Sequence, residues 1–211
     1  MIVGAVMTAG WHLTHDPEDT RDGLAVDQYL SLHHVTWLNP VAETIAVALS
    51  PVGAVVITAL IAALVWWRRN LWWAVSFAGT VACGWLFVGI IKLVIARPRP
   101  APWSLADPLM PEVNNASFPS GHTAFTTALM VGLVLLTVTA AHRSVRSKWW
   151  LVAIAGAVFV AVVAVSRVYM GVHYPADVIC AVPTALAGCC FATGLWNTVV
   201  AKRHSHELTK E

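Results

Sequence analysis

The amino-acid sequence predicts an all-α integral membrane helical bundle. Of its 211 residues, 58% are hydrophobic and only 11% are charged, whereas about a quarter of the residues in a soluble domain are charged. Five apolar stretches without a charged residue meet or approach the roughly 20 residues that cross a hydrocarbon core. A soluble protein with five such stretches is excluded, because its buried helices would normally keep a polar face.

The five apolar stretches are separated by segments of different lengths. They cover residues 44–67, 71–91, 123–141, 149–165 and 178–201. Pro51 and Gly53 lie inside the first stretch, where membrane helices tolerate both residue types. Residues 1–13 are apolar but too short to cross a bilayer, which predicts a short or truncated sixth helix. The expected divisions of the chain are an N-terminal apolar and interfacial region (1–43), a transmembrane domain (44–201) and a cytoplasmic tail (202–211).

Basic residues collect on one side of the predicted bundle. If the spans alternate in direction, that side holds eight of the 13 Lys and Arg residues: Arg68, Arg69, Arg143, Arg146, Lys148, Lys202, Arg203 and Lys210. Cytoplasmic loops carry such an excess of positive charge, and tryptophans gather at the membrane interfaces as they do beside these loops. We therefore expect the basic loops inside the cell and the opposite ends of the spans outside it.

The segments between the spans differ in character. Residues 16–27 are acidic and hydrophilic, and residues 28–40 mix apolar side chains with histidines, which suits a helix lying at the membrane interface. The longest outer loop, residues 95–119, carries six prolines, so no continuous helix is expected there. All four cysteines fall inside spans, so the sequence indicates neither a disulfide framework nor a zinc site.

Three clusters of polar residues lie at the predicted outer ends of the spans. The first is Lys92 with Arg99, the second is residues 119–122, and the third is residues 166–177. Ionisable residues at membrane depth are costly and usually face a cavity or one another. Because the three clusters share one side of the membrane, we expect them to form one site.

The cations in these clusters indicate that the site binds an anion. Lys92, Arg99 and Arg167 have few acids nearby, and guanidinium and ammonium groups both suit phosphate oxygens. Ser120 stands at the expected N-cap of the third span, where free amides and the helix dipole favour a phosphate. Gly121 would allow the ligand to approach the backbone closely.

Two histidines and one carboxylate in the clusters indicate catalysis. His173 and Asp177 are four residues apart, and Pro175 between them suits the first turn of a helix. A carboxylate in that turn could pair with the histidine, fix its tautomer and raise the basicity of its other nitrogen. Such a histidine is a good nucleophile toward phosphorus. His122 is a second imidazole, available as a general acid.

Together the clusters resemble the signature of the type 2 phosphatidic acid phosphatase superfamily. That signature reads K-x6-R-P, then P-S-G-H, then S-R-x5-H-x3-D. Every position is filled here, in the expected order: Lys92, Arg99 and Pro100; Pro119, Ser120, Gly121 and His122; Ser166, Arg167, His173 and Asp177.

The resemblance implies a bundle of six transmembrane helices with an active site at its outer end. It implies a membrane lipid phosphatase in which His173 attacks phosphorus, Asp177 orients it, and His122 protonates the leaving group. The residues that it implies for phosphate binding are Lys92, Arg99, Ser120, Gly121 and Arg167. It also implies that no metal or other cofactor takes part, and that the partner is a membrane lipid rather than a nucleic acid.

Three other functions fit parts of the pattern. A vanadium-dependent haloperoxidase has a similar anion pocket, but those enzymes are soluble. A lipid transporter or binding protein with a degenerate site is disfavoured because the set of catalytic positions is complete. A metal hydrolase built on His122, His173 and Asp177 is disfavoured because the surrounding cations would repel a metal ion and no further carboxylate cluster is available.

The identity of the lipid is less constrained than the reaction. The signature contacts the phosphate and carries no information about the tail. The candidates are an isoprenoid diphosphate such as the undecaprenyl or decaprenyl carrier, phosphatidylglycerol phosphate and phosphatidic acid. We favour an isoprenoid diphosphatase or an enzyme of broad specificity.

Overall fold

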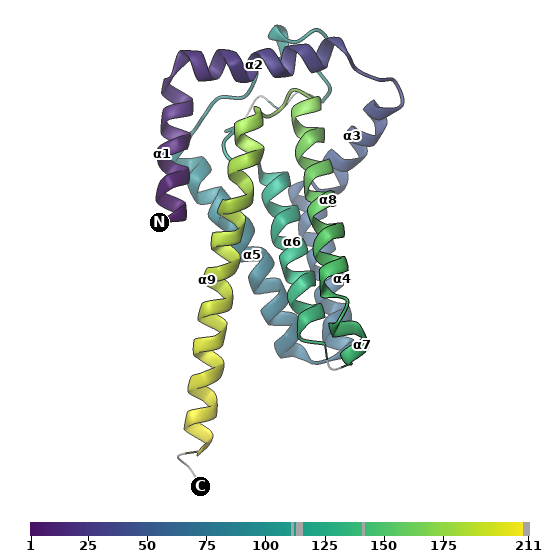
Figure 1. The fold of residues 1–211 in the computed structure, drawn as a ribbon, viewed down its shortest axis with the longest axis vertical. Coiled ribbons are helices and arrows are strands. Elements are labelled where there is room, and N and C mark those ends of the chain that lie inside the picture. Colours follow the sequence, from purple (N-terminus) through teal and green to yellow (C-terminus); the bar gives the residue numbers. More distant parts are fainter. Residues whose placement is uncertain (111, 113–115, 141, 209–211) are drawn as a thin grey trace.

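Five long apolar helices form the body of the protein in the computed structural model, which describes residues 1–110, 112, 116–140 and 142–208. They are α4 (Pro51–Arg68), α5 (Leu71–Ile95), α6 (Gly121–Val138), α8 (Trp149–Tyr169) and α9 (Pro175–Leu208). All five provide a segment long and apolar enough to cross a membrane, and the described residues contain no strand. The predicted all-α membrane bundle is confirmed (Figure 1).

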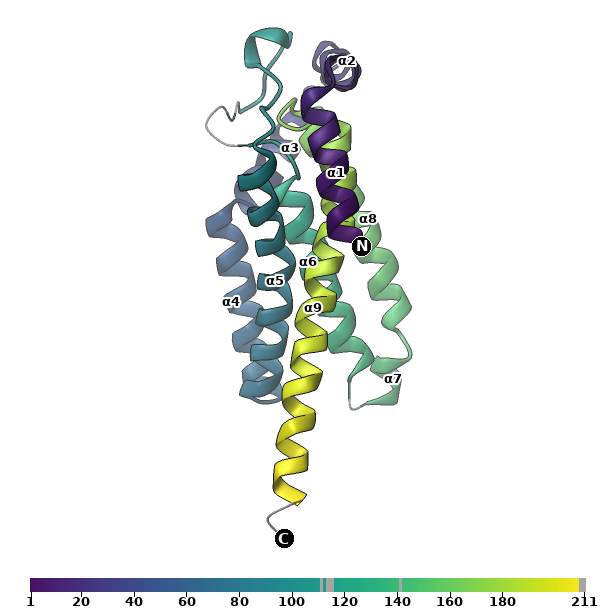
Figure 2. The ribbon, with the colours of Figure 1, turned by 90° about the vertical axis from the view of Figure 1, so that its left-hand side faces the viewer.

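Helix α6 is the central element of the bundle. It packs against α5, α8 and α9, whereas α4 packs mainly on α5 at the edge (Figures 1 and 2). Its apolar window is the most buried of the five spans, and that of α4 is the least buried. The largest hydrophobic cluster includes Phe77, Val81, Phe125, Leu129 and Val163. The first turn of α6 is therefore surrounded by the ends of the other spans.

Small residues bring α5 and α9 into close contact. A Cβ atom on Gly188 would lie 2.5 Å from the carbonyl oxygen of Cys83, and one on Gly84 would lie 2.7 Å from the sulfur of Cys189 and 3.2 Å from the carbonyl oxygen of Ala185. Backbone contact through small residues is a usual way to pack helices in membranes. It fixes α9 against α5, and so places the first turn of α9 beside the last turn of α5.

Two further helices cover one end of the bundle, the end that the sequence predicts to be the outer one. The first, α1 (Ile2–His15), is shorter than a span and lies beside the outer half of α9, as expected for a short sixth helix (Figure 1). Its Val6 packs with Ile95 and Phe118. The second, α2 (Pro17–Leu32), runs across the bundle and is seen end-on in Figure 2.

The expected interfacial helix at residues 28–40 was placed too late in the chain. The helix in this region is α2, and it begins in the acidic segment. Asp16 caps it by accepting a hydrogen bond from the Glu18 amide at 2.8 Å, and Pro17 occupies its first turn. An Asp-Pro pair is a strong helix start. This start signal, and not the apolar content of the later residues, determines where the helix begins.

The first expected span, from Thr44, was also wrong at its start. A separate helix, α3 (Leu38–Ala48), precedes α4, and the chain bends between them. Ser50 caps α4 by accepting from the Gly53 amide, and Pro51 is its first residue. A Cβ on Gly53 would lie 2.0 Å from the Ala48 carbonyl oxygen, so the bend requires glycine there. Pro51 and Gly53 thus begin a helix rather than interrupt one.

The long outer loop is attached to the outer ends of the helices. Its described residues contain one short 3₁₀ helix, η1 (Pro102–Ser104). The His34 ring contacts the Asp107 carboxylate through Nδ1 at 2.9 Å and the Tyr169 carbonyl oxygen through Nε2 at 2.8 Å. These contacts join the loop to the segment between α2 and α3 and to the end of α8. At the opposite end, α7 (Arg143–Arg146) precedes α8.

Candidate active site

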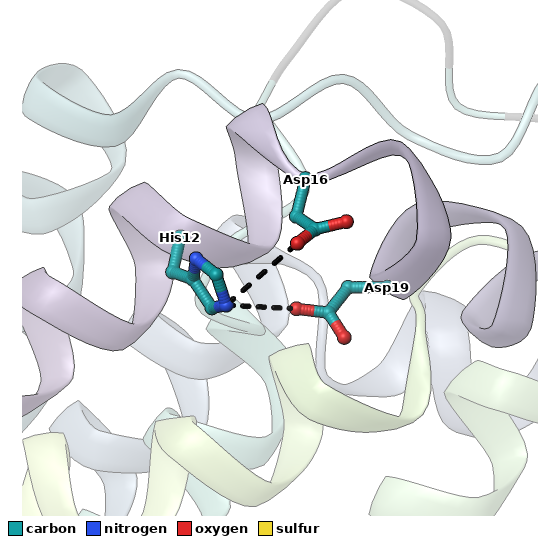
Figure 3. A group of neighbouring side chains, drawn as sticks. All are labelled: His12, Asp16 and Asp19. Carbon is teal, nitrogen blue, oxygen red and sulfur yellow. Dashed lines mark ion pairs between the residues drawn. The ribbon is translucent and has the colours of Figure 1, made fainter.

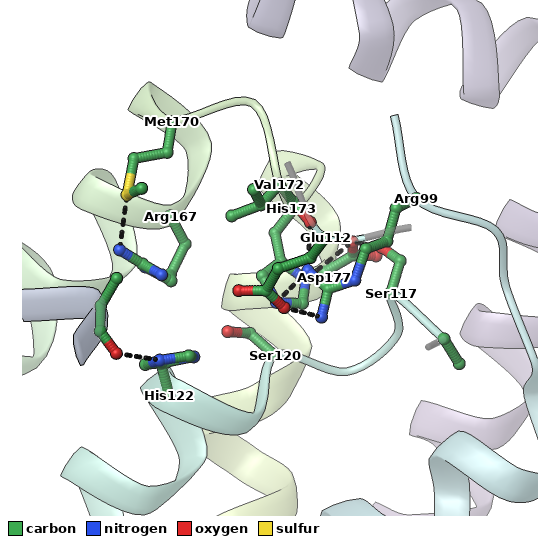
Figure 4. A network of polar contacts seen from close by, with 12 residues as sticks. Arg99, Glu112, Ser117, Ser120, His122, Arg167, Met170, Val172, His173 and Asp177 are labelled. Atoms are coloured by element: carbon green, nitrogen blue, oxygen red, sulfur yellow. Dashed lines mark hydrogen bonds and ion pairs between the residues drawn. The ribbon is translucent and has the colours of Figure 1, made fainter. Parts of the chain in front are cut away.

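The three polar clusters of the sequence converge at the outer ends of the spans. Lys92 lies in the last turn of α5 and Arg167 in the last turn of α8. Ser120 is the N-cap of α6, and Asp177 lies in the first turn of α9. Figure 4 shows that His173 and Asp177 lie near Arg99 and Ser120, with His122 and Arg167 further along the same site.

A cavity of about 820 Å³ opens beside these residues. Its polar end is formed by Lys92, Arg99, Glu112, Gly121, His122 and His173. The rest of its wall comes chiefly from the α3–α4 bend and from α5: Ala46, Val47, Leu49, Ser50, Pro51, Trp85, Leu86, Val88 and Gly89. One chamber thus joins a cationic end to a largely apolar wall, as suits a ligand with an anionic head and an apolar tail.

His173 reaches the cavity from the connection before α9 and is 1% exposed. Its Nδ1 lies 3.4 Å from Asp177 Oδ2, and its Nε2 lies 3.2 Å from Arg99 Nη1. A guanidinium can only donate, so Nε2 must be the unprotonated nitrogen and Nδ1 must carry the hydrogen. Burial, aided by the charges of Arg99 and Lys92 and opposed by Asp177, lowers the pKa of His173 to about 3. The imidazole is therefore neutral at pH 7, with the Nε2 lone pair directed to the cationic side.

Asp177 is surrounded by donors. Its Oδ1 accepts from Arg97 Nη1 at 2.9 Å, and its Oδ2 accepts from the Tyr174 amide at 3.0 Å. The Ser117 hydroxyl also donates to Oδ2, which lies 3.4 Å from His173 Nδ1. A carboxylate with only donors around it fits the ionised form. The distance to His173 is longer than a good hydrogen bond, and such contacts often shorten when a substrate binds.

The start of α6 has the geometry of an anion site. Ser120 Oγ accepts from the Thr123 hydroxyl at 3.2 Å and caps the helix, as predicted. The Ser120 amide already has a hydrogen-bond partner, since it donates to the Asp177 carbonyl oxygen at 3.0 Å. Gly121 lines the cavity, and a Cβ there would be 4.0 Å from Lys92 Cε. The Gly121 backbone is thus open to a ligand that also meets Lys92.

Arg167 is placed differently from the other predicted phosphate ligands. It is 0% exposed and is not part of the cavity wall. Its Nη2 donates to the Ala42 carbonyl oxygen at 3.1 Å and contacts the Met170 sulfur at 2.7 Å. Its Nη1 has no hydrogen-bond partner among the described residues. In this arrangement Arg167 joins α8 to α3, and one end of its guanidinium is available to an anion.

His122 lines the cavity from the first turn of α6. Its Nε2 lies 3.1 Å from the carbonyl oxygen of Ala46 on α3. A carbonyl can only accept, so this nitrogen carries a hydrogen. The ring is therefore held between α6 and the α3 wall.

Two residues of the site were not predicted. Arg97 is 1% exposed, pairs with Asp177 and stacks over Tyr174 with 4.1 Å between the guanidinium carbon and the ring centroid. Ser117 is 0% exposed, and its amide donates to the Arg97 carbonyl oxygen at 2.7 Å. A buried aspartate requires a counter-ion. Arg97 is a basic residue beside the signature to which no role had been assigned, and this could have identified it as that counter-ion. Ser117 had no comparable signal.

Glu112 contributes an acid to the cationic end of the cavity. Its Oε2 lies 2.7 Å from Arg99 Nη2, so it competes with any anion for that guanidinium. We expect Glu112→Gln to tighten inhibition by orthovanadate roughly 3- to 10-fold, since an ion pair whose side chains are 6% and 32% exposed contributes about 1 kcal/mol. The measurement is the inhibition constant of the purified protein.

The control for this substitution is Asp107→Asn, which removes the same charge from the same loop at a residue that pairs with His34 instead. Its inhibition constant for orthovanadate should stay within about twofold of the unsubstituted protein, because distant exposed charges are screened. Equal tightening in both variants would mean that net charge, and not the Arg99 contact, sets the affinity.

One group of metal-type ligands occurs elsewhere in the described residues. His12, Asp16 and Asp19 lie at the corner between α1 and α2, with ligand atoms within 4.8 Å of one another (Figure 3). Asp16 is already the cap of α2, and His12 Nε2 lies 3.8 Å from Asp16 and 3.6 Å from Asp19. Helix capping and ion pairing at an exposed corner account for the group.

Comparisons with known proteins agree with this geometry. The undecaprenyl-diphosphatase BcrC of Bacillus subtilis (strain 168) is 31% identical over 154 residues, which are 72% of this chain and 73% of that protein. The fold matches the crystal structure of a transmembrane PAP2 type phosphatidylglycerolphosphate phosphatase from Bacillus subtilis, with a TM-score of 0.79, 23% identity and coverage of 93% and 95% of the two chains. A model of the PAP2 superfamily matches residues 73–204. The chain therefore belongs to the PAP2 superfamily, and the predicted class of membrane lipid phosphatase is confirmed.

Proposed function

We propose that the protein removes the terminal phosphate of an isoprenoid diphosphate lipid at the outer face of the membrane, with His173 as the nucleophile. The observation that carries this proposal is the cavity, in which Lys92, Arg99 and His173 share one chamber with an apolar wall. An anionic head and a lipid tail can occupy such a chamber together. The isoprenoid is favoured by the relative that is 31% identical, an undecaprenyl-diphosphatase.

Binding places the terminal phosphate between the cations and the start of α6. Arg99 lies 3.2 Å from the His173 Nε2 atom, so a phosphate held by Arg99 is adjacent to the attacking nitrogen. Lys92 approaches from α5, beside Gly121. The positive end of α6 supports the negative charge that accumulates in the transition state. Arg167 would join through its unpartnered Nη1.

The first step transfers the phosphoryl group to the enzyme. The Nε2 lone pair of His173 forms a bond to phosphorus while the bond to the bridging oxygen breaks, and the lipid monophosphate leaves with that oxygen. The hydrogen on Nδ1 faces Asp177, whose negative charge stabilises the imidazole as it becomes cationic. His122 supplies a proton to the leaving oxygen when that oxygen needs one.

The second step returns the enzyme to its starting state. A water oxygen attacks phosphorus, the bond to Nε2 breaks, and inorganic phosphate is released. His122 accepts the proton of that water in the reverse of its earlier role. In both steps Lys92 and Arg99, which line the cavity, neutralise the phosphate oxygens.

A panel of lipids tests this function. Phosphate release by the purified protein in detergent should be fastest from an isoprenoid diphosphate, with kcat/KM about tenfold above that for phosphatidylglycerol phosphate or phosphatidic acid. The activity should persist in excess EDTA and be inhibited by orthovanadate, which resembles pentacoordinate phosphorus. A higher kcat/KM for either glycerolipid would contradict the substrate, and loss in EDTA that Mg²⁺ restores would contradict the mechanism.

The proposed orientation follows from the positions of the charges. Helix α4 ends at Arg68 and is followed by Arg69, and α7 carries Arg143 and Arg146, all at the end of the bundle away from the cavity (Figure 1). Positive loops remain in the cytoplasm. This supports a cavity that faces the periplasm or the outside, and a tail at residues 202–211 that is cytoplasmic.

Cysteine labelling tests the orientation. A cysteine at Trp103, which is 87% exposed on the outer loop, should react with a membrane-impermeant maleimide on intact cells. A cysteine at Ser147, exposed after α7, should react only after permeabilisation. The chain without either substitution controls for its four native cysteines. The reverse pattern would place the cavity on the cytoplasmic side.

A further inference from the structure

An acidic side chain from α2 is buried close to the catalytic pair. Asp27 is 0% exposed, and neither of its carboxyl oxygens has a hydrogen-bond partner among the described residues. Elsewhere on the same helix Asp22 is 80% exposed, as is usual for this residue type. A buried carboxyl without a partner is costly, and such groups are concentrated at functional sites.

The buried face of α2 is directed at Tyr174, which together with Arg97 donates hydrogen bonds to Asp177. One turn before Asp27, Gly23 lies against Tyr174, since a Cβ on Gly23 would be 3.0 Å from the Tyr174 ring. The same Tyr174 ring also contacts Arg97, whose guanidinium carbon is 4.1 Å from the ring centroid. Residues four apart share a helix face, so Asp27 faces the same group of side chains.

Arg97 is paired with one acid, Asp177, and its charge also acts on a second, Asp27. It donates from Nη1 to Asp177 Oδ1 at 2.9 Å, while its buried Nε has no hydrogen-bond partner among the described residues. The charges that act on Asp27 are those of Asp177 and Arg97. The Arg97 guanidinium thus pairs with Asp177, which must be ionised for catalysis. It also lies near Asp27, which can be either neutral or ionised.

We propose that Asp27 is a positioning residue for His173 and Asp177 and acts through Arg97. While Asp27 is neutral, Arg97 is left to Asp177, which keeps its orientation toward His173. When Asp27 ionises, it attracts the guanidinium and weakens that support. The inference rests on the proposed function in that His173 is taken as the nucleophile. It gives residues 17–32, which lie outside the stretch matched by the superfamily model, a part in catalysis.

The pH range of this effect follows from the surroundings of Asp27. Burial, followed by the charge of Asp177, raises the pKa of Asp27 to about 8, against the opposing influence of Arg97. The ionisable groups around it are Asp177 from α9, Arg97 from the outer loop and Tyr174 from the α8–α9 connection. The pKa of Tyr174 is itself raised, mainly by burial, so this ring stays neutral. Asp27 is therefore protonated below pH 8 and ionised above it.

The test compares pH profiles of two forms of the full-length protein. We measure kcat for an aryl phosphate between pH 6.5 and 9.5 and take the ratio of Asp27→Asn to the unsubstituted protein. All other titrating groups are shared, so they cancel in the ratio. The ratio should rise about tenfold across pH 8, with the KM ratio unchanged, because Lys92 and Arg99 are not affected. A flat ratio would overturn the proposal.

Three further variants make the result specific. Asp22→Asn removes an exposed acid from the same helix and should give a flat ratio. With Arg97→Gln as the background, Asp27→Asn should also give a flat ratio, because the intermediary is absent; a rise there would overturn the route through Arg97. Asp27→Ser provides a second neutral side chain, and loss of activity at pH 6.5 in both neutral variants would show that the neutral form is not the active one. Failure of the proposed function would appear separately, as activity in His173→Ala.

Discussion

Replacing His173 with alanine abolishes phosphate release from every substrate, whether an isoprenoid diphosphate, a monoester lipid or an aryl phosphate. We expect a loss of roughly 10⁴-fold or more in kcat, as for other enzymes that lose their nucleophile. The reason is the geometry of the ring, whose unprotonated Nε2 faces Arg99 while Nδ1 faces Asp177. The loss should be independent of the leaving group, since no covalent intermediate can form. Steady-state release of phosphate measures it.

The matched control is His15→Ala, which removes a histidine from the corner of α1 and should keep kcat within about twofold. His173→Ala should retain its thermal stability within a few degrees, so that loss of activity is not loss of fold. Orthovanadate binding adds a second control, because Lys92 and Arg99 remain in place. Residual hydrolysis above a hundredth of the normal rate would contradict His173 as the nucleophile.

His122→Ala has an effect that depends on the leaving group. An alkoxide leaving from phosphatidic acid needs a proton, and general acid catalysis contributes roughly 10²–10⁴-fold. A nitrophenolate, or a lipid monophosphate leaving from a diphosphate, needs the proton much less. We therefore expect kcat for a monoester lipid to fall by that factor while the first step on an aryl phosphate is largely kept. Single-turnover kinetics separate that step from the next.

The same variant should accumulate a phosphoenzyme if His122 also activates water. An acid-labile, covalently bound phosphate should then be trapped during turnover of an aryl phosphate and be absent in His173→Ala. His142→Ala, at an exposed residue just before α7, is the control and should change neither observation. Equal losses for good and poor leaving groups, without a trapped phosphoenzyme, would contradict separate roles for the two histidines.

Most of the site was predictable because its residues stand at helix ends. Runs of apolar residues determine the spans, and alternation of spans brings their outer ends to one side. Ser120 and Pro175 mark the starts of α6 and α9 by capping and by helix-start preference. Once those two starts are known, His122, His173 and Asp177 are within a turn of the same end of the bundle.

The remainder depended on packing that local sequence does not encode. Arg97 and Arg99 are two residues apart in the same proline-rich segment, and only the tertiary structure assigns the first to Asp177 and the second to the cavity. The position of Arg167 behind the wall follows from the contact of α8 with Ala42. The bend at Ser50 was hidden because proline and glycine in an apolar run are compatible with both a continuous and an interrupted helix.

The bend between α3 and α4 has a consequence for how this enzyme can diversify. It supplies one wall of the cavity through residues 46–51, whereas the superfamily model matches residues 73–204, which contain every signature residue. Part of the apolar wall therefore lies outside the matched stretch, whereas the α5 part of the wall and the residues proposed to act on the phosphate lie inside it. We expect exchange of residues 38–51 between relatives to alter which lipids are accepted while the phosphate chemistry is retained.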